Sequence, residues 1–171
     1  MILKMKIITL LIFLMVSLKI SAQRPYFVDG YHGGVYGHYP SWVTGFMLDN
    51  LAAHPEWKIG IEIEPETWDS VKRADPEAYA RLAVMAGDSR IEFTNPTYAQ
   101  PYCYNISGES IIRQFAYGMQ KIREHFPQVS YSTYAVEEPC FTSSLPQLLK
   151  QFGFKYAVLK SPNTCWGGYT S

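Results

Sequence analysis

Residues 57–94 read WKIGIEIEPETWDSVKRADPEAYARLAVMAGDSRIEFT, and the order of patterns in this stretch determines the fold class. Apolar and polar residues alternate over 57–63, which predicts a strand, and residues 90–94 predict the next one. Between them, Asp75-Pro76 is typical of a helix start, with an N-cap followed by proline, and this helix is expected to reach about Ala86. A strand, a helix and a strand in this order predict parallel strands joined by a right-handed crossover.

The same alternation of strands and helices continues on both sides of this stretch. Strands are expected over 25–29, 57–63, 90–94, 129–136 and 154–159, and helices over 44–54, 76–86, 110–126 and 145–152. The fold class is therefore α/β, with parallel β/α units. We expect residues 23–171 to form one domain, because a chain of this length can bury a substantial core.

The first 22 residues have the pattern of a secretory signal peptide. Two lysines precede an apolar run over 7–18, and Ser21-Ala22 provides small residues for cleavage before Gln23. The apolar run is shorter than the roughly 20 residues that span a bilayer. We therefore expect a signal peptide over 1–22, a secreted, periplasmic or extracellular protein, and no stable membrane insertion after cleavage.

Composition and charge narrow the classes of function. The 171 residues are 47% hydrophobic and 18% charged, which argues against disorder. Lys+Arg 15 balances Asp+Glu 15, so the chain lacks the basic surface that nucleic-acid binding requires. Aromatic residues make up 15% of the chain, and their rings serve either to pack a core or to stack on flat ligands such as sugars.

The chain has three cysteines, Cys103, Cys140 and Cys165. In an oxidising compartment they can form one disulfide and leave one thiol. Their spacing does not match a structural zinc site. Buried, inert thiols are the favoured interpretation for at least two of them.

Polar side chains follow the carboxyl ends of four predicted strands. They are Asp29 and His32 after the first strand, Glu62, Glu64 and Glu66 after the second, Asn95 after the third, and Glu137 and Glu138 after the fourth. The carboxyl ends of parallel strands meet at one edge of a sheet or barrel, so these residues predict a polar cleft. Such a cleft suits glycoside hydrolysis by paired carboxylates or metal-assisted hydrolysis by His and Asp ligands, and spacing does not separate the two.

Residues 134–154, YAVEEPCFTSSLPQLLKQFGF, resemble the nucleophile region of glycoside hydrolase family 38, the α-mannosidases. In that family a strand ends in the catalytic Asp, then Pro-Phe-Gly-His-Ser, and then a helix with Leu-Pro and Gly-Phe. The segment Arg90-Ile-Glu92 and the helix that follows Gly108 are similar to further family segments. The resemblance implies the family's N-terminal catalytic domain, the first part of a glycoside hydrolase or deacetylase type of β/α-barrel. Because the chain ends at Ser171, it implies a divergent relative or a truncated one.

The resemblance also implies an activity, cleavage of α-mannosidic or related glycosidic bonds by a retaining mechanism. Glu137 stands at the family's nucleophile position, where it replaces Asp, and Glu138 is its neighbour and the second catalytic candidate. The loop of Tyr31 and His32 stands where the family has a zinc motif. The candidate metal ligands, for zinc or another divalent ion, are His32, Asp29 and His38.

The expected partner is an oligosaccharide or glycan. The candidate substrate-binding residues are Glu64, Asn95, Tyr31 and Trp42, the first two because they follow strands and the last two because aromatic rings stack on sugars. Two other functions remain open. One is a metal-dependent polysaccharide deacetylase, and the other is a carbohydrate-binding protein without catalysis.

Overall fold

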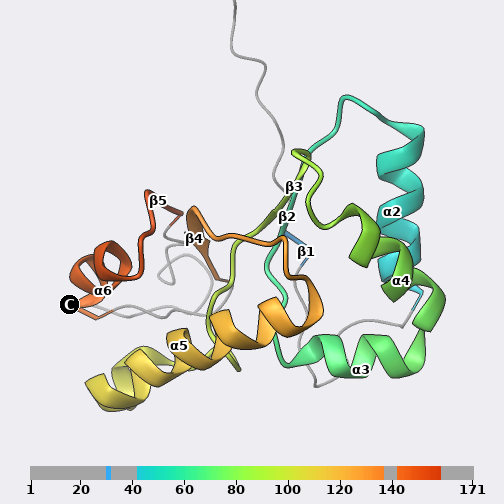
Figure 1. Ribbon diagram of the computed structural model, residues 1–171. Helices are drawn as coiled ribbons and strands as arrows, with labels where there is room; N and C mark the ends of the chain where they lie inside the picture. Colours follow the sequence, from blue (N-terminus) through green and yellow to red (C-terminus); the bar gives the residue numbers. More distant parts are fainter. Residues whose placement is uncertain (1–29, 32–41, 137–141, 159–171) are drawn as a thin grey trace, which may run out of the picture.

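The computed structural model describes residues 30–31, 42–136 and 142–158 (Figure 1). Its elements are β1 (Gly30–Tyr31), α2 (Val43–Ala53), β2 (Ile59–Ile61), α3 (Thr67–Ala74), α4 (Pro76–Met85), β3 (Ile91–Phe93), the 3-10 helix η1 (Cys103–Asn105), α5 (Gly108–His125), β4 (Thr133–Ala135), α6 (Leu145–Gln151) and β5 (Tyr156–Val158). None of the helices in these ranges is both long and apolar enough to cross a membrane.

All paired strands are parallel. In the three-stranded sheet the order is β1-β2-β3, with Ile61 opposite Phe93, and β4 pairs with β5 in a second sheet. The two sheets meet where the backbone N–H of Ala135 donates to the carbonyl of Thr94 at 3.0 Å. The expected α/β class with parallel strands is confirmed, and a closed barrel is not formed by the described residues.

The helix boundaries follow from local chemistry. The Asp75 carboxylate accepts a hydrogen bond from the backbone N–H of Ala78 at 3.0 Å, which confirms the expected N-cap of α4. At the end of α6, Gly153 has φ 86, a conformation that favours glycine. The elements differ from the expectation at three places. The first described strand, β1, is at 30–31, whereas the expected strand over 25–29 lies outside the described residues, and η1 and α3 are not among the expected elements. Helix α3 precedes α4 and ends at the same Asp75, whereas the expectation placed a helix start only at Asp75-Pro76.

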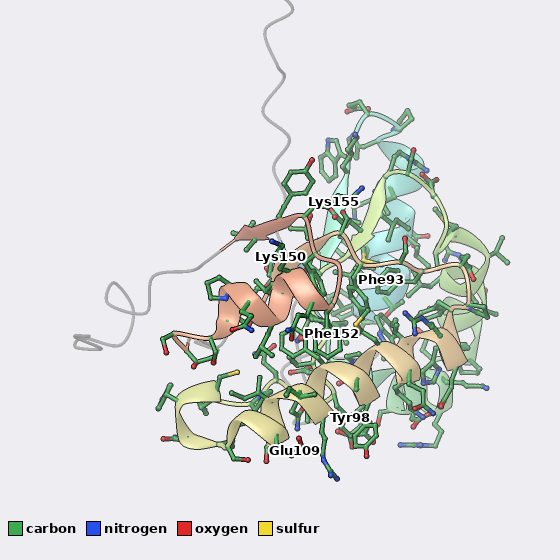
Figure 2. The ribbon with its side chains drawn as sticks, turned by 60° about the vertical axis from the view of Figure 1, so that its left-hand side comes forward. Phe93, Tyr98, Glu109, Lys150, Phe152 and Lys155 are labelled. Carbon is green, nitrogen blue, oxygen red and sulfur yellow. The ribbon has the colours of Figure 1, made fainter. Side chains whose placement is uncertain are left out.

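Two buried clusters form the core. In the first, residues of α2, α3, α4 and the end of α5 cover one face of β2 and β3. The rings of Trp68 and Phe126 meet edge to face there, with their centroids 5.3 Å apart. In the second, the first half of α5 and helix α6 cover β4. The ring of Phe115 stacks on that of Phe152, with their centroids 5.2 Å apart. Figure 2 labels Phe93 of the first cluster and Phe152 beside the second.

Cys103 is buried in the second cluster and is disulfide-bonded. Of the two possibilities that the sequence leaves for the cysteines, this is the disulfide. The preference for at least two inert thiols is wrong, because a chain with three cysteines keeps at most one thiol once a pair forms. Burial does not keep a thiol reduced when a second cysteine reaches it. Cys140 and Cys165 lie outside the described residues.

Candidate active site

The carboxyl ends of β1, β2 and β3 point to the same edge of the sheet, because the three strands are parallel (Figure 1). Side chains alternate between the two faces of a strand. Ile61 and Ile63 belong to the core cluster under the helices, so Glu62 between them lies on the opposite face, where it is buried. Glu92 alternates in the same way with the core residues of β3. The sheet therefore carries carboxylates on the face turned away from the helices.

Asn95 is the best-anchored residue at this edge. Its buried amide nitrogen donates to the carbonyl of Glu62 at 3.2 Å and to Gln100 Oε1 at 2.8 Å. Its amide oxygen accepts from the backbone N–H of Thr97 at 3.0 Å and from the Thr97 hydroxyl at 2.7 Å. These four bonds use both donors and both acceptor sites of the amide. Asn95 thus fixes the loop that follows β3 to the end of β2.

The segment before β4 is hydrogen-bonded to β3 and to the loop that follows it. The Tyr131 hydroxyl donates to the carbonyl of Asn95 at 3.0 Å, and the Ser132 hydroxyl donates to Glu92 Oε1 at 2.9 Å. Burial raises the pKa of Tyr131 far above the ordinary value of a phenol, which keeps its hydroxyl protonated as a donor. The segment before β4 is therefore tied to β3 at the same edge.

The other predicted substrate-binding residues have different surroundings. Glu64 is half-buried, and its Oε2 accepts a hydrogen bond from the Thr67 hydroxyl at 3.4 Å. Trp42 is exposed just before α2, and its ring meets that of Phe46 edge to face at 5.8 Å. Tyr31 is paired with Ile61 through the backbone of β1. The structure brings Asn95 and Tyr31 to the end of β2 and leaves Trp42 at the start of α2.

The end of β4 follows the same alternation. Tyr134 and Val136 are buried in the second cluster under α5 and α6, and Ala135 between them faces the other way. Burial raises the pKa of Tyr134, so its phenol stays neutral. The catalytic candidates Glu137 and Glu138 lie outside the described residues, as do the metal candidates Asp29, His32 and His38. Among the described residues, no group of three or more His, Cys, Asp or Glu gathers to hold a metal.

Sequence reasoning missed how tightly the loop after β3 is bound to α5. Gln114 of α5 accepts from the backbone N–H of Ala99 at 3.0 Å through its side chain and from that of Tyr98 at 2.9 Å through its carbonyl. Figure 2 shows Tyr98 beside this helix. Gln100 has φ 43, a left-handed conformation supported by its bond to Asn95. The available signal was Gly118, since a glycine inside a helical pattern marks a close approach.

Comparison with known proteins identifies the domain. Residues 43–162 match the model described as the glycosyl hydrolases family 38 N-terminal domain. A 4-alpha-glucanotransferase from Thermococcus litoralis has a similar structure, with TM-score 0.62 and 16% identity over 77% of this chain and 22% of that one. A CE4 family pseudoenzyme from Bacillus anthracis gives TM-score 0.55 and 18% identity over 76% of this chain and 42% of that one. No curated protein matches at the level of sequence.

The similar structures and the family match support different conclusions. At such low identities the two structures support only the fold, and the chain spans about a fifth of the glucanotransferase. The family match covers well over half of the chain and includes the segments at 90–92 and 134–154 that carry the resemblance. It assigns the domain to a family of glycosyl hydrolases. The expectation from those two segments is confirmed, and the chain belongs to glycosyl hydrolase family 38 through that family's N-terminal domain.

Proposed function

We propose that this protein is a secreted glycosidase that cleaves α-mannosidic or related glycosidic bonds with retention of configuration. The observation that carries the proposal is the alternation at the end of β4. Tyr134 and Val136 pack under the helices and Ala135 faces away from them. Glu137 lies outside the described residues, and the alternation in the sequence predicts that it shares the face of Ala135. Glu62 and Glu92 also lie on the face of their sheet that is turned away from the helices.

The chemistry assigned to Glu137 is nucleophilic. In the first step its carboxylate attacks the anomeric carbon, while a protonated carboxyl group donates its proton to the leaving glycosidic oxygen. A glycosyl ester forms on Glu137 and the glycosidic bond breaks. In the second step water, deprotonated by the same acid/base group, attacks the anomeric carbon and releases Glu137 as the carboxylate. Glu64, Tyr31 and Trp42 are the proposed substrate-binding residues. Asn95, whose amide is fully hydrogen-bonded within the protein, would act at the same edge by holding the loop after β3 in place.

We propose that a divalent metal, zinc first, is bound by His32 with Asp29 and His38. A bound zinc ion supplies a positive charge that orients sugar hydroxyls next to the reacting carbon. Elemental analysis of the protein purified after zinc supplementation is expected to show bound zinc, and His32→Ala is expected to remove it. A protein that stays free of divalent metal after supplementation would overturn this assignment.

Substrate assays test the activity itself. The purified full chain is expected to release the aryl group from an aryl α-mannoside and to leave acetylated oligosaccharides unchanged. Release of acetate with no aryl release would instead establish a metal-dependent deacetylase. Binding of oligosaccharides with neither product would establish a carbohydrate-binding protein without catalysis.

Export is a separate proposal with its own measurement. When the full chain is expressed in a secreting host, the exported protein is expected to begin near Gln23 in N-terminal sequencing. A protein that keeps residues 1–22 and stays with the membrane fraction would show that this segment is an anchor.

A further inference from the structure

Two exposed tyrosines flank the buried disulfide cysteine of the loop after β3. Tyr102 is 40% exposed and Tyr104 is 47% exposed, while Cys103 between them is 2% exposed. The centroids of the two tyrosine rings lie 5.7 Å apart, and their planes are inclined by 58°. The backbone is therefore turned inward at Cys103, and the aromatic rings on either side of it reach solvent as a pair.

The backbone that carries this pair is held at several points. Cys103 is disulfide-bonded and buried in the second cluster, and the N–H of Asn105 donates to the carbonyl of Tyr102 at 2.9 Å. Earlier in the loop, the network of Asn95 and the hydrogen bonds from Tyr98 and Ala99 to Gln114 of α5 fix residues 95–100. Rings carried by a rigid backbone lose little conformational entropy when a ligand binds.

The position of the pair relates it to the candidate active site. Cys103 shares its buried cluster with Val136, at the carboxyl end of β4, and with Leu145, at the start of α6. These two residues bracket the segment that contains Glu137. The tyrosine pair is therefore anchored to the cluster that includes the residue following β4, and the proposed nucleophile is the next residue in the sequence.

We propose that Tyr102 and Tyr104 form a subsite that binds one sugar ring of the glycan next to the bond that is cleaved. The inference rests on the proposed function for the identity of the ligand. A pyranose ring presents C–H groups on its faces and hydroxyls on its rim, and a tyrosine offers an apolar face and a polar hydroxyl to match both. Tyr134, by contrast, is buried in the core and cannot meet a ligand.

The test measures binding of trisaccharides to the full, oxidised chain by titration calorimetry. The probes are α-mannotriose, maltotriose and chitotriose, and the variants are Tyr102→Ala, Tyr104→Ala and the double change. Each single change is expected to weaken binding of the preferred trisaccharide about fivefold, the typical contribution of an aromatic contact, and the double change by more. Tyr102→Phe keeps the ring and is expected to bind nearly as well as the parent chain.

Tyr117→Ala is the matched control, since Tyr117 is also an exposed tyrosine but lies in the middle of α5. It is expected to leave trisaccharide affinity unchanged, and unchanged melting of all variants verifies folding. Equal affinity of the double variant and the parent, or no binding of any trisaccharide by the parent, would overturn the subsite. A parent that binds through these tyrosines but does not hydrolyse aryl mannosides would refute the proposed activity and leave the subsite standing.

Discussion

Gly118 shows how a single residue determines the packing of the loop after β3. A Cβ at this position would overlap the carbonyl oxygen of Pro96 and lie 2.7 Å from the backbone nitrogen of Tyr98. Both neighbours are backbone atoms, which cannot rotate away as a side chain can. Because the loop lies this close to α5, the backbone N–H of Tyr98 reaches the carbonyl of Gln114 at 2.9 Å.

Gly118→Ala is therefore expected to destabilise the protein. Alanine ordinarily improves an exposed helix by about 1 kcal/mol relative to glycine, but a forced backbone shift costs roughly 1–3 kcal/mol or more, and here the clash dominates. We expect a net loss of about 1–2 kcal/mol in the free energy of unfolding, measured by urea denaturation. Gly108→Ala is the control, because a Cβ there meets nothing within 4 Å. Equal stability of the two variants would contradict the close approach.

Glu137 and Glu138 give the second prediction at the scale of residues. Adjacent residues of a strand point to opposite faces, so only one of the two carboxylates can share the face of Ala135. Glu137→Gln keeps the shape and removes the nucleophile, and hydrolysis of an aryl α-mannoside is expected to fall by several orders of magnitude. Glu138→Gln is expected to reduce the rate of hydrolysis far less. A larger loss for Glu138→Gln would show that the register of this strand is shifted by one residue.

At the scale of elements, helices α3, α4 and α5 are joined by a polar cluster. His125 Nδ1 of α5 lies 2.8 Å from the Tyr79 hydroxyl of α4, and His125 Nε2 lies 3.3 Å from Asp69 Oδ1 of α3. Lys121 Nζ lies 2.8 Å from the other oxygen of Asp69. The hydrogen bond from Lys121 lowers the pKa of Asp69, while burial lowers the pKa of His125 more than Asp69 raises it. The neutral imidazole can therefore accept a hydrogen bond from Tyr79.

This cluster predicts a loss of stability in mild acid. The pKa of His125 is lower in the folded protein than its ordinary 6.5, so the unfolded chain takes up the proton first as the pH falls. The neutral His125 therefore contributes to the free energy of unfolding in full above pH 6.5, and this contribution is lost as the pH falls toward the pKa of His125 in the folded protein. We expect the urea midpoint to decrease between about pH 7.5 and about pH 5.5, and to decrease less in His125→Gln.

The other charged groups near His125 change the stability at a different pH or do not change it. Asp69 has a lowered pKa, so its contribution is lost only as the pH falls below its ordinary 3.8, and Lys121 keeps its charge throughout because its pKa is raised. Lys72 and Glu124 act on His125 with opposite signs. His54 is exposed, and His54→Gln is a control expected to leave the pH dependence unchanged. An identical pH dependence in His125→Gln and the parent would contradict the assignment.

The sequence predicts well those elements whose causes are local. Asp75 caps α4 as expected, and α6 ends at Gln151, one residue before its expected end, because helix ends depend on residues within one turn. The parallel order of strands also follows from their alternation with helices. The bonds of Asn95 and Gln114 were not predictable, because they join residues brought together by the fold. The disulfide of Cys103 could be stated only as one of the possibilities for three cysteines.

For the whole molecule, the informative feature is the exposure of β5. Tyr156 is 67% exposed and Val158 is 55% exposed, and within the described part of the chain β5 pairs with β4 alone. A strand with β-branched and aromatic side chains and an unpaired edge is a template for pairing with another chain. We therefore expect the 171-residue chain to self-associate as its concentration rises, through contacts between copies of β5.

Val158→Lys is expected to reduce this self-association, because a charge on an edge strand disfavours pairing between strands. The average mass in solution, measured by light scattering over a concentration series, is expected to rise for the parent chain and to stay closer to that of one chain for the variant. Val84→Lys is the control, since Val84 is equally apolar and is exposed on helix α4, which offers no strand edge. If both lysine variants suppress association equally, added charge rather than the edge of β5 is the cause. A parent chain that stays monomeric at every concentration and melts cooperatively would show that β5 does not mediate self-association.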